Sequence, residues 1–318
     1  MKILIAGGAG YIGSVLVPEL IGRGYDVDVL DLLWFGNNLP PNVNIIQREI
    51  LTLREKDLAG YDQVVFLAGL SNDPMAEYSP SSNFVDNAAV PAYLSYISKR
   101  AGVRRFVYAC SCSVYGYSVD ALCDETALAV SHYPYGISKL QGEFACLSLQ
   151  DDKFSTISLR KGTVSGYSPR MRLDLIINTM FKTAVTEKVI NVNNPAIWRP
   201  IIDVRDAASA HIRAIEVDPG VSGIFNIAYG NYTVGEVADY VREGVKQYLN
   251  IDARINIKHI SDFRNYKVTC DKARNVLSFN PRYHITDTVK SLAENWEKFK
   301  DMDNPKYYNI QVFKMLNR

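Results

Sequence analysis

The chain has 318 residues, 47% of them hydrophobic and 22% charged, which is ample for one large domain or two interlocked ones. Its 35 Lys and Arg residues nearly balance its 34 Asp and Glu residues, and the formal net charge is +1. This balance argues against a nucleic-acid or membrane partner bound through bulk electrostatics.

The first half of the chain alternates short apolar runs with amphipathic stretches. Strands are predicted for residues 2–6, 25–30, 42–46, 63–68, 104–109 and 154–159, and helices for stretches between them such as 11–24 and 88–102. Strand and helix repeated in this way predict an α/β fold with a doubly wound parallel sheet of the Rossmann type over residues 1–165.

After about residue 166 the pattern loosens. Helices are predicted at 172–187, 205–216, 233–249 and 286–300, and short strands near 189–192, 200–204 and 254–258. We expect residues 166–318 to form mainly a smaller α/β lobe, with part of 195–230 returning to the first domain. This lobe would cover the carboxyl edge of the first sheet, where ligands of open parallel sheets bind.

The motif GGAGYIG, residues 7–13, lies between the first strand and the first helix. Gly7 would allow a tight turn, Gly10 the close approach of a pyrophosphate, and Gly13 a close helix–strand contact. The helix amino terminus would offer N–H groups to the phosphates. Asp31 closes the next strand, where an acid would hold ribose hydroxyls and repel a 2′-phosphate. No arginine follows in DLLWFGNN, so NAD is favoured over NADP.

Tyr135 and Lys139, in YPYGISK, lie four residues apart on a predicted helix and therefore on one face. A nearby ammonium favours the phenolate and lowers the pKa of the phenol toward the range of a useful general base. The spacing by itself is common, so mere helical neighbours remain the alternative.

The strand at 104–109 runs into CSCSVYG, which brings Ser111 and Ser113 to the carboxyl end of the sheet. GGAGYIG, LAGLS (67–71), CSCSVYG and YxxxK occur in that order. In these motifs the chain resembles the extended short-chain dehydrogenases/reductases that act on nucleotide sugars, over nearly its whole length. The resemblance implies NAD as cofactor and a nucleotide-diphosphate sugar as substrate.

The resemblance also assigns roles. Ser111 would hydrogen-bond the substrate hydroxyl, and Tyr135 would remove its proton while hydride leaves the same carbon. Lys139 would hold the nicotinamide ribose and lower the tyrosine pKa. Glu49 stands where an aspartate usually contacts adenine, and Asn87 near the nicotinamide end. The implied cofactor contacts are Gly7, Gly10, Tyr11, Ile12, Gly13, Asp31, Glu49, Ile50, Leu67, Ala68, Gly69, Asn87, Tyr135 and Lys139.

Three segments of the second half resemble those with which this family grips a nucleotide diphosphate: 166–178, 197–208 and 260–273. Diphosphates suit planar bidentate donors, so Arg199 and Arg264 are the best candidates. Arg170 or Arg172 could serve the sugar or the diphosphate, or either could pair with Asp174 on a surface helix. The expected substrate contacts are Ser71, Ser113, Thr163, Arg172, Asn178, Arg199 and Arg264.

The residues after Ser111 separate the reactions of this family. Its 4,6-dehydratases carry an Asp-Glu pair where Cys112 and Ser113 stand here, and its 3,5-epimerising members a cysteine where Ser113 stands. Cys112 should point away from the site, into the core. Oxidation at carbon 4 remains, in a 4-epimerase or a 4-dehydrogenase. The alternatives are a 4-keto-sugar reductase, and less favoured a dinucleotide sensor or a reductase of apolar ketones.

The five cysteines show no paired framework, and Cys110 and Cys112 lack the second half of a zinc site, so we expect reduced thiols and no metal. With no signal peptide and no stretch of about 20 apolar residues, a soluble cytoplasmic protein is expected. Relatives commonly dimerise through two helices, which here would be 83–101 and the one starting at Tyr135. Apolar positions that permit a homodimer are Val90, Ala92, Tyr93, Leu94 and Ile97.

Overall fold

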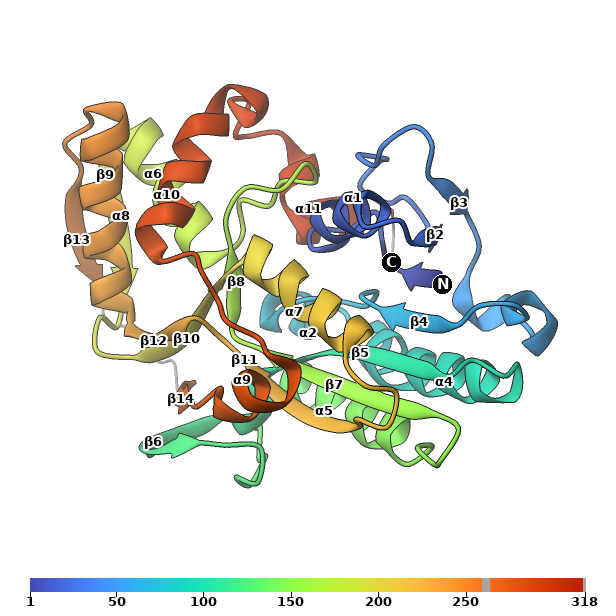
Figure 1. The fold of residues 1–318 in the computed structure, drawn as a ribbon. Coiled ribbons are helices and arrows are strands. Elements are labelled where there is room, and N and C mark those ends of the chain that lie inside the picture. Colours follow the sequence, from blue (N-terminus) through green and yellow to red (C-terminus); the bar gives the residue numbers. More distant parts are fainter. Residues whose placement is uncertain (259–263, 317–318) are drawn as a thin grey trace.

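The computed structural model describes residues 1–258 and 264–316, and its centre is a seven-stranded parallel sheet (Figure 1). The strand order is β11-β7-β5-β4-β1-β2-β3, so the order reverses between β1 and β4. The predicted doubly wound parallel sheet is thereby confirmed. The strands are β1 (Lys2–Ala6), β2 (Asp26–Leu30), β3 (Asn44–Ile46), β4 (Gln63–Phe66), β5 (Arg105–Ser111), β7 (Ser155–Lys161) and β11 (Gly223–Ile227).

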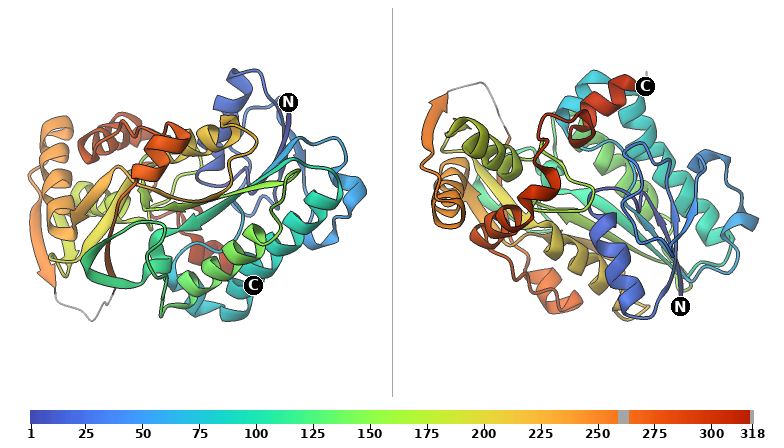
Figure 2. Two further views of the ribbon diagram at one scale, coloured as in Figure 1. Left: turned by 60° about the horizontal axis from the view of Figure 1, so that its bottom comes forward. Right: turned by 90° about the horizontal axis from the view of Figure 1, so that it is seen from above.

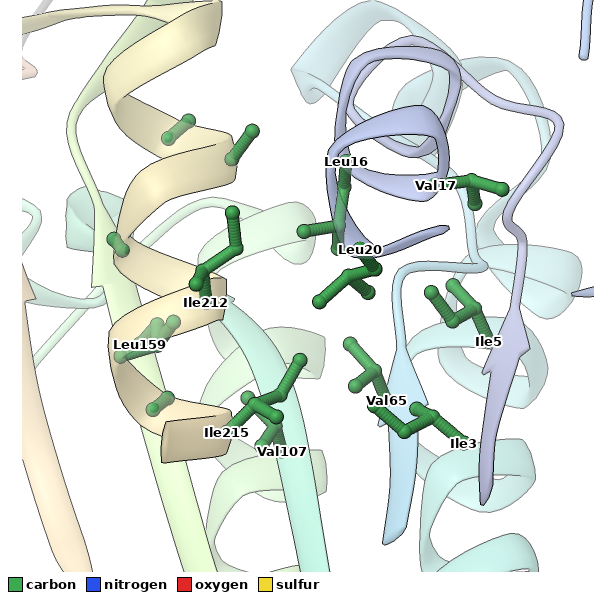
Figure 3. Close-up of a cluster of buried hydrophobic side chains, with 14 of the residues drawn as sticks. Ile3, Ile5, Leu16, Val17, Leu20, Val65, Val107, Leu159, Ile212 and Ile215 are labelled. Carbon is green, nitrogen blue, oxygen red and sulfur yellow. The ribbon is translucent and has the colours of Figure 1, made fainter. Parts of the chain in front are cut away.

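Both faces of this sheet are buried, because its central strands carry apolar side chains toward both faces. In β1, Ile3 and Ile5 enter one hydrophobic core and Leu4 and Ala6 enter another. Helices α1 (Gly13–Gly22) and α7 (Val204–Glu216) lie side by side over the first face, where Leu20 and its neighbours fill the space above the strands (Figure 3). Helices α4 (Val90–Arg100) and α5 (Pro134–Leu147) cover the other face.

The range 195–230, part of which was expected to return to the first domain, contains α7 and the edge strand β11. β11 is not among the predicted strands, because GIFNI is a short run that gains its strand partners only by pairing with β7. The first domain therefore needs residues from well beyond position 165.

The second lobe includes helices α6, α8 and α10, which lie together in Figure 1. It has a separate core built around Phe181, Val241 and Leu292. Helix α6 begins at Ile176, not at 172 as predicted, because residues 172–175 run in other conformations along the pocket described below. The last predicted helix ends at Asn295 and continues as a 3-10 turn. The lobe contains β8 (Thr163–Ser165), α6 (Ile176–Glu187), β9 (Val189–Asn193), β10 (Trp198–Asp203), β12 (Gly230–Thr233), α8 (Val234–Leu249), β13 (Arg254–Lys258) and α10 (Ile285–Asn295).

The last described helix, α11 (Asn309–Met315), returns to the first domain, close to the short helix α2 (Asp73–Tyr78) (Figure 2). Phe313 is buried against Leu70, Met75 and Trp34. The remaining elements are α3 (Pro80–Phe84), β6 (Tyr117–Cys123), β14 (Asn265–Val268) and α9 (Asp271–Leu277). Among the described residues, the helices are all too short or too polar to span a membrane.

Candidate active site

A pocket of about 990 Å³ opens at the carboxyl ends of β1, β4, β5 and β7, at the point where the strand order reverses. Residues of the second lobe form its opposite wall. Predicted site residues that line it are Gly7, Gly10, Tyr11, Ile12, Gly13, Asp31, Glu49, Ile50, Leu67, Ala68, Gly69, Ser71, Ser111, Ser113, Tyr135, Thr163, Arg172, Arg199 and Arg264. Lys139, Asn87 and Asn178 are buried behind the residues that line the pocket.

The glycine turn has the geometry of a phosphate cradle. Gly7 has a φ of +81°, and a Cβ there would lie 2.5 Å from the backbone N of Ala68; a Cβ on Gly13 would lie 2.2 Å from the carbonyl oxygen of Gly8. Helix α1 starts beside this turn with no side-chain cap, so its first N–H groups suit a phosphate. The residues present therefore fit a dinucleotide.

Asp31 lies at the end of β2 next to this turn, where it was expected. Its carboxylate accepts hydrogen bonds from the backbone N–H groups of Ala9, at 2.9 Å, and Leu33, at 2.8 Å. Burial raises the pKa of Asp31, and these two backbone donors oppose the shift. Each carboxylate oxygen keeps a lone pair, so the group can still accept from ribose hydroxyls.

Ser111 and Tyr135 meet at the inner end of the pocket. Ser111 ends β5, and its Oγ accepts from the backbone N–H of Ser113 at 3.2 Å and donates to the Ser113 Oγ at 3.1 Å. Tyr135 lies in the first turn of α5 and lines the same cavity. The Ser113 hydroxyl is 3.4 Å from that of Tyr266, a pocket residue that the sequence did not suggest.

The ionisation of Tyr135 differs from the expectation. Burial raises the pKa of its phenol, the buried Cys110 and the carboxylate of Asp73 add to the shift, and Ser111 opposes it. Lys139 donates to the Ala109 carbonyl oxygen at 3.3 Å, and its Nζ is 5.9 Å from the centre of the Tyr135 ring. The prediction of a lowered pKa for Tyr135 is therefore wrong for the protein alone, because desolvation by burial is the largest influence on this pKa.

A second lysine, missed by sequence reasoning, stands at the same end of the pocket. Lys161 lines the cavity, pairs with Ser111 in the β5–β7 register and donates to the Cys110 carbonyl oxygen at 2.9 Å. Burial lowers the pKa of Lys161 to about 7, with repulsion by Lys139 adding to it, and burial lowers that of Lys139 to about 8. The available signal was a lysine at the end of a buried strand next to the strand that ends at Ser111.

A buried ion pair fixes α5, the helix of Tyr135, to the sheet. Arg160 on β7 approaches Glu143 on α5 to 2.5 Å, and both side chains are almost fully buried. Ser158 donates to the same carboxylate at 2.7 Å, and Arg160 also donates to the Tyr115 hydroxyl at 2.9 Å. Both charges are thus satisfied inside the protein.

Three arginines that the second lobe contributes to the pocket are held by protein groups. Arg172 forms two hydrogen bonds with Asp174, at 2.8 and 3.0 Å, and Arg264 contacts Asp73 at 2.5 Å. Arg199 donates to the carbonyl oxygens of Trp198 and Arg264. Of the predicted segment 260–273, residues 260–263 lie outside the described part of the chain.

Residues behind the wall support it. Asn178 accepts from the backbone N–H of Gly166 at 2.9 Å and donates to the carbonyl oxygen of Arg172 at 2.7 Å, so it holds the chain at 166–172 in place. Asn87 donates to the Leu70 carbonyl oxygen at 2.9 Å, directly behind Gly69. Cys112 is fully buried, as predicted, and all five cysteines are free thiols.

Comparisons with known proteins agree with this geometry. Residues 3–228 match the model of the NAD dependent epimerase/dehydratase family. UDP-glucose 4-epimerase of Corynebacterium glutamicum is 26% identical, across 93% of this chain and 95% of the relative, and UDP-glucuronic acid decarboxylase 1 of Arabidopsis thaliana is 24% identical, across 93% and 70%. MoeE5, solved in complex with UDP-glucuronic acid and NAD, matches 94% of this chain and 99% of its own with a TM-score of 0.82 and 25% identity. The chain belongs to the NAD-dependent epimerase/dehydratase family.

Proposed function

We propose that this protein is an NAD-dependent epimerase of nucleotide-diphosphate sugars that acts at carbon 4 of the sugar, in a cytoplasm that keeps its buried thiols reduced. The observation that carries the proposal is one continuous cavity shared by the glycine turn, Asp31, Ser111 and Tyr135. Relatives named as UDP-glucose 4-epimerases, matched over almost their whole length, support the same reaction.

The residues at the inner end divide the work. Tyr135 accepts the proton of the sugar hydroxyl, and Ser111 donates a hydrogen bond to the oxygen as its carbon becomes a ketone. The cofactor, when bound, supplies a hydride acceptor and a positive charge that favours the phenolate. In the return step the protonated Tyr135, the form favoured by its raised pKa, gives the proton back to the ketone oxygen.

The substrate end contains arginines that already contact protein groups. Arg264 and Arg199 line the cavity together with Thr163 and Ser71, and they are our candidates for the diphosphate and the sugar. Because Asp73 holds Arg264 at 2.5 Å, a diphosphate would exchange with this carboxylate for the guanidinium. UDP is the nucleotide to test first, since it occurs in the names of the relatives.

The test is to incubate the protein with UDP-glucose and UDP-glucuronic acid, then with TDP- and GDP-sugars. Proton NMR of the sugar ring shows inversion at carbon 4, and absorbance at 340 nm reports NADH. Epimer without lasting NADH supports the proposal. Stoichiometric NADH with a released ketone would make the protein a dehydrogenase, and consumption of added NADH by a 4-keto sugar a reductase.

For assembly we propose a homodimer through α4 and α5. Val90, Leu94 and Ile97, expected to permit this contact, are buried inside the subunit and cannot form it. Tyr96 and Phe144 are instead 51% and 60% exposed on these two helices. Sedimentation of Phe144→Lys beside the unmodified protein checks this, and equal masses at equal concentration would refute the contact.

A further inference from the structure

Arg170 is a buried cation in the pocket wall, for which the sequence left open a role at the sugar or diphosphate and an ion pair with Asp174. The pair with Asp174 is formed by Arg172 instead. It is only 3% exposed and lines the cavity. Its guanidinium carbon lies 3.6 Å from the centre of the Phe35 ring, and one amino group donates to Asn309 at 2.5 Å. The side chain is therefore held firmly between the first domain and α11.

Two of the donors of Arg170 have no protein acceptor. The Nε and Nη1 atoms are buried and make no hydrogen bond with any described residue. An unsatisfied buried donor is destabilising, and a charged one more so, so native structures keep such groups mainly where a ligand completes them. Burial lowers the pKa of Arg170 to about 9, so the group stays charged at neutral pH.

The surroundings indicate which ligand this is. The chain at 166–170 is tied to the glycine turn, because Tyr11 donates to the Gly166 carbonyl oxygen at 2.5 Å and Ser168 donates to the Tyr11 carbonyl oxygen at 2.7 Å. The nearby carboxylates do not accept the two unused donors of Arg170, because Asp174 pairs with Arg172 and Asp31 accepts from backbone N–H groups. Both carboxylates attract Arg170 only through their charge. An anionic ligand bound near the glycine turn would satisfy both of these donors.

We propose that Arg170 binds the pyrophosphate of the dinucleotide, so that the second lobe supplies a cationic donor to a site that otherwise offers backbone N–H groups. The two unused N–H groups of the planar guanidinium match two phosphate oxygens. The sugar-nucleotide diphosphate is the weaker match, because Arg170 packs on Phe35 and interacts electrostatically with Tyr11, in the glycine turn, and Asp31, at the end of β2. These residues belong to the first domain and line the same cavity.

The test compares Arg170→Met with the unmodified protein, both freed of bound nucleotide, by calorimetric titration with NAD+, ADP, adenosine, 2′,5′-ADP and UDP. We expect ADP and NAD+ to bind about 10- to 100-fold more weakly and adenosine and UDP to be unchanged. The control is Arg274→Met, which removes the same charge from an exposed helix where Arg274 pairs with Asp271.

A separate readout distinguishes binding from structure. Without nucleotide, Arg170→Met should melt within about 2 °C of the unmodified protein, since Met can pack on Phe35 and leaves no unsatisfied donor of its own. Added NAD+ should then raise its Tm less than that of the unmodified protein. If the Met variant does not fold, Arg170→Lys keeps a charge but not the planar donors and should still weaken ADP.

Several outcomes would overturn the inference. Equal weakening of adenosine and ADP would make Arg170 structural. A loss confined to UDP would move it to the second nucleotide, and a loss seen with 2′,5′-ADP but not with ADP would move it to a 2′-phosphate. Unchanged ADP affinity in both Arg170→Met and Arg170→Lys would show that Arg170 does not bind a phosphate. None of these results touches the proposed epimerase reaction, which the product assay decides separately.

Discussion

The charged side chains at the two ends of the pocket differ in their partners. At the inner end, Lys139 and Lys161 donate to backbone carbonyl oxygens of β5, have no carboxylate partner among the described residues, and have depressed pKa values. The outer end is the part of the pocket wall that contains Arg172 and Arg264, and both of these arginines are paired with carboxylates. We therefore expect the lysines of the inner end to lose their protons more readily than free lysines. We expect the arginines of the outer end to exchange a carboxylate partner for an anionic ligand.

The largest expected effect comes from removing the proposed proton carrier of the inner end. Tyr135→Phe should lower kcat by about 10³-fold, because the hydroxyl proton then has no acceptor. NAD content and Tm should stay unchanged, since only one oxygen is lost. Steady-state kinetics on the substrate found by the product assay checks this.

The matched control is Tyr266→Phe, which removes another hydroxyl from the same cavity, 3.4 Å from the Ser113 Oγ. It should lower kcat by less than about tenfold. Comparable losses in the two variants would mean that Tyr135 is not the proton carrier and that the proposed role of the inner end is wrong.

The next largest effect concerns the support of the inner end. Glu143→Gln removes the only charge that Arg160 is paired with among the described residues, so a buried guanidinium is left uncompensated. We expect a loss of about 3 kcal/mol in the free energy of unfolding, measured by urea denaturation. Asp303→Asn, at an exposed pair with Lys182, should change it by less than about 0.5 kcal/mol. Similar values for both would show that the buried pair does not fix α5.

Lys161→Met tests the depressed pKa of the inner end. The folded pKa of about 7 lies below the unfolded value of 10.5, so between these values the unfolded chain holds a proton that the folded one has released. The stability of the unmodified protein should therefore rise by about 2 kcal/mol relative to the variant from pH 7 to pH 9. Urea titrations at the two pH values measure the difference, and parallel curves would contradict a buried amine with this pKa.

The smallest expected effect sharpens the outer end. Arg264→Met should weaken UDP binding by about tenfold, and Asp73→Asn should strengthen it by a few fold, because the neutral amide releases the guanidinium. Calorimetric titration with UDP measures both. Weaker binding in Asp73→Asn would show that the carboxylate positions Arg264 and does not compete with the diphosphate.

Much of the fold and part of the site could be predicted from local sequence. Gly7, Asp31 and Tyr135 are each recognisable from a few neighbouring residues, because the glycine turn, the strand end and the i,i+4 spacing are local features. The positions of Lys161 and Arg170 in the pocket depend on contacts with residues more than 50 positions away, such as Cys110 and Asn309, which local sequence does not record. The sign of the pKa shift of Tyr135 was missed for a related reason: it depends on total burial, which no motif records.

Helix α11 gives the cofactor pocket a dependence on the order of synthesis. Asn309 donates to Ser71 at 2.8 Å and Phe313 packs on Trp34, so the wall beside the first domain contains residues made nearly 240 positions later. On the ribosome, the parallel sheet can form while that side of the nucleotide cavity still lacks its cover. We therefore expect a nascent chain to bind the dinucleotide tightly only after residue 313 has left the exit tunnel. Cofactor binding would then be a late step of folding.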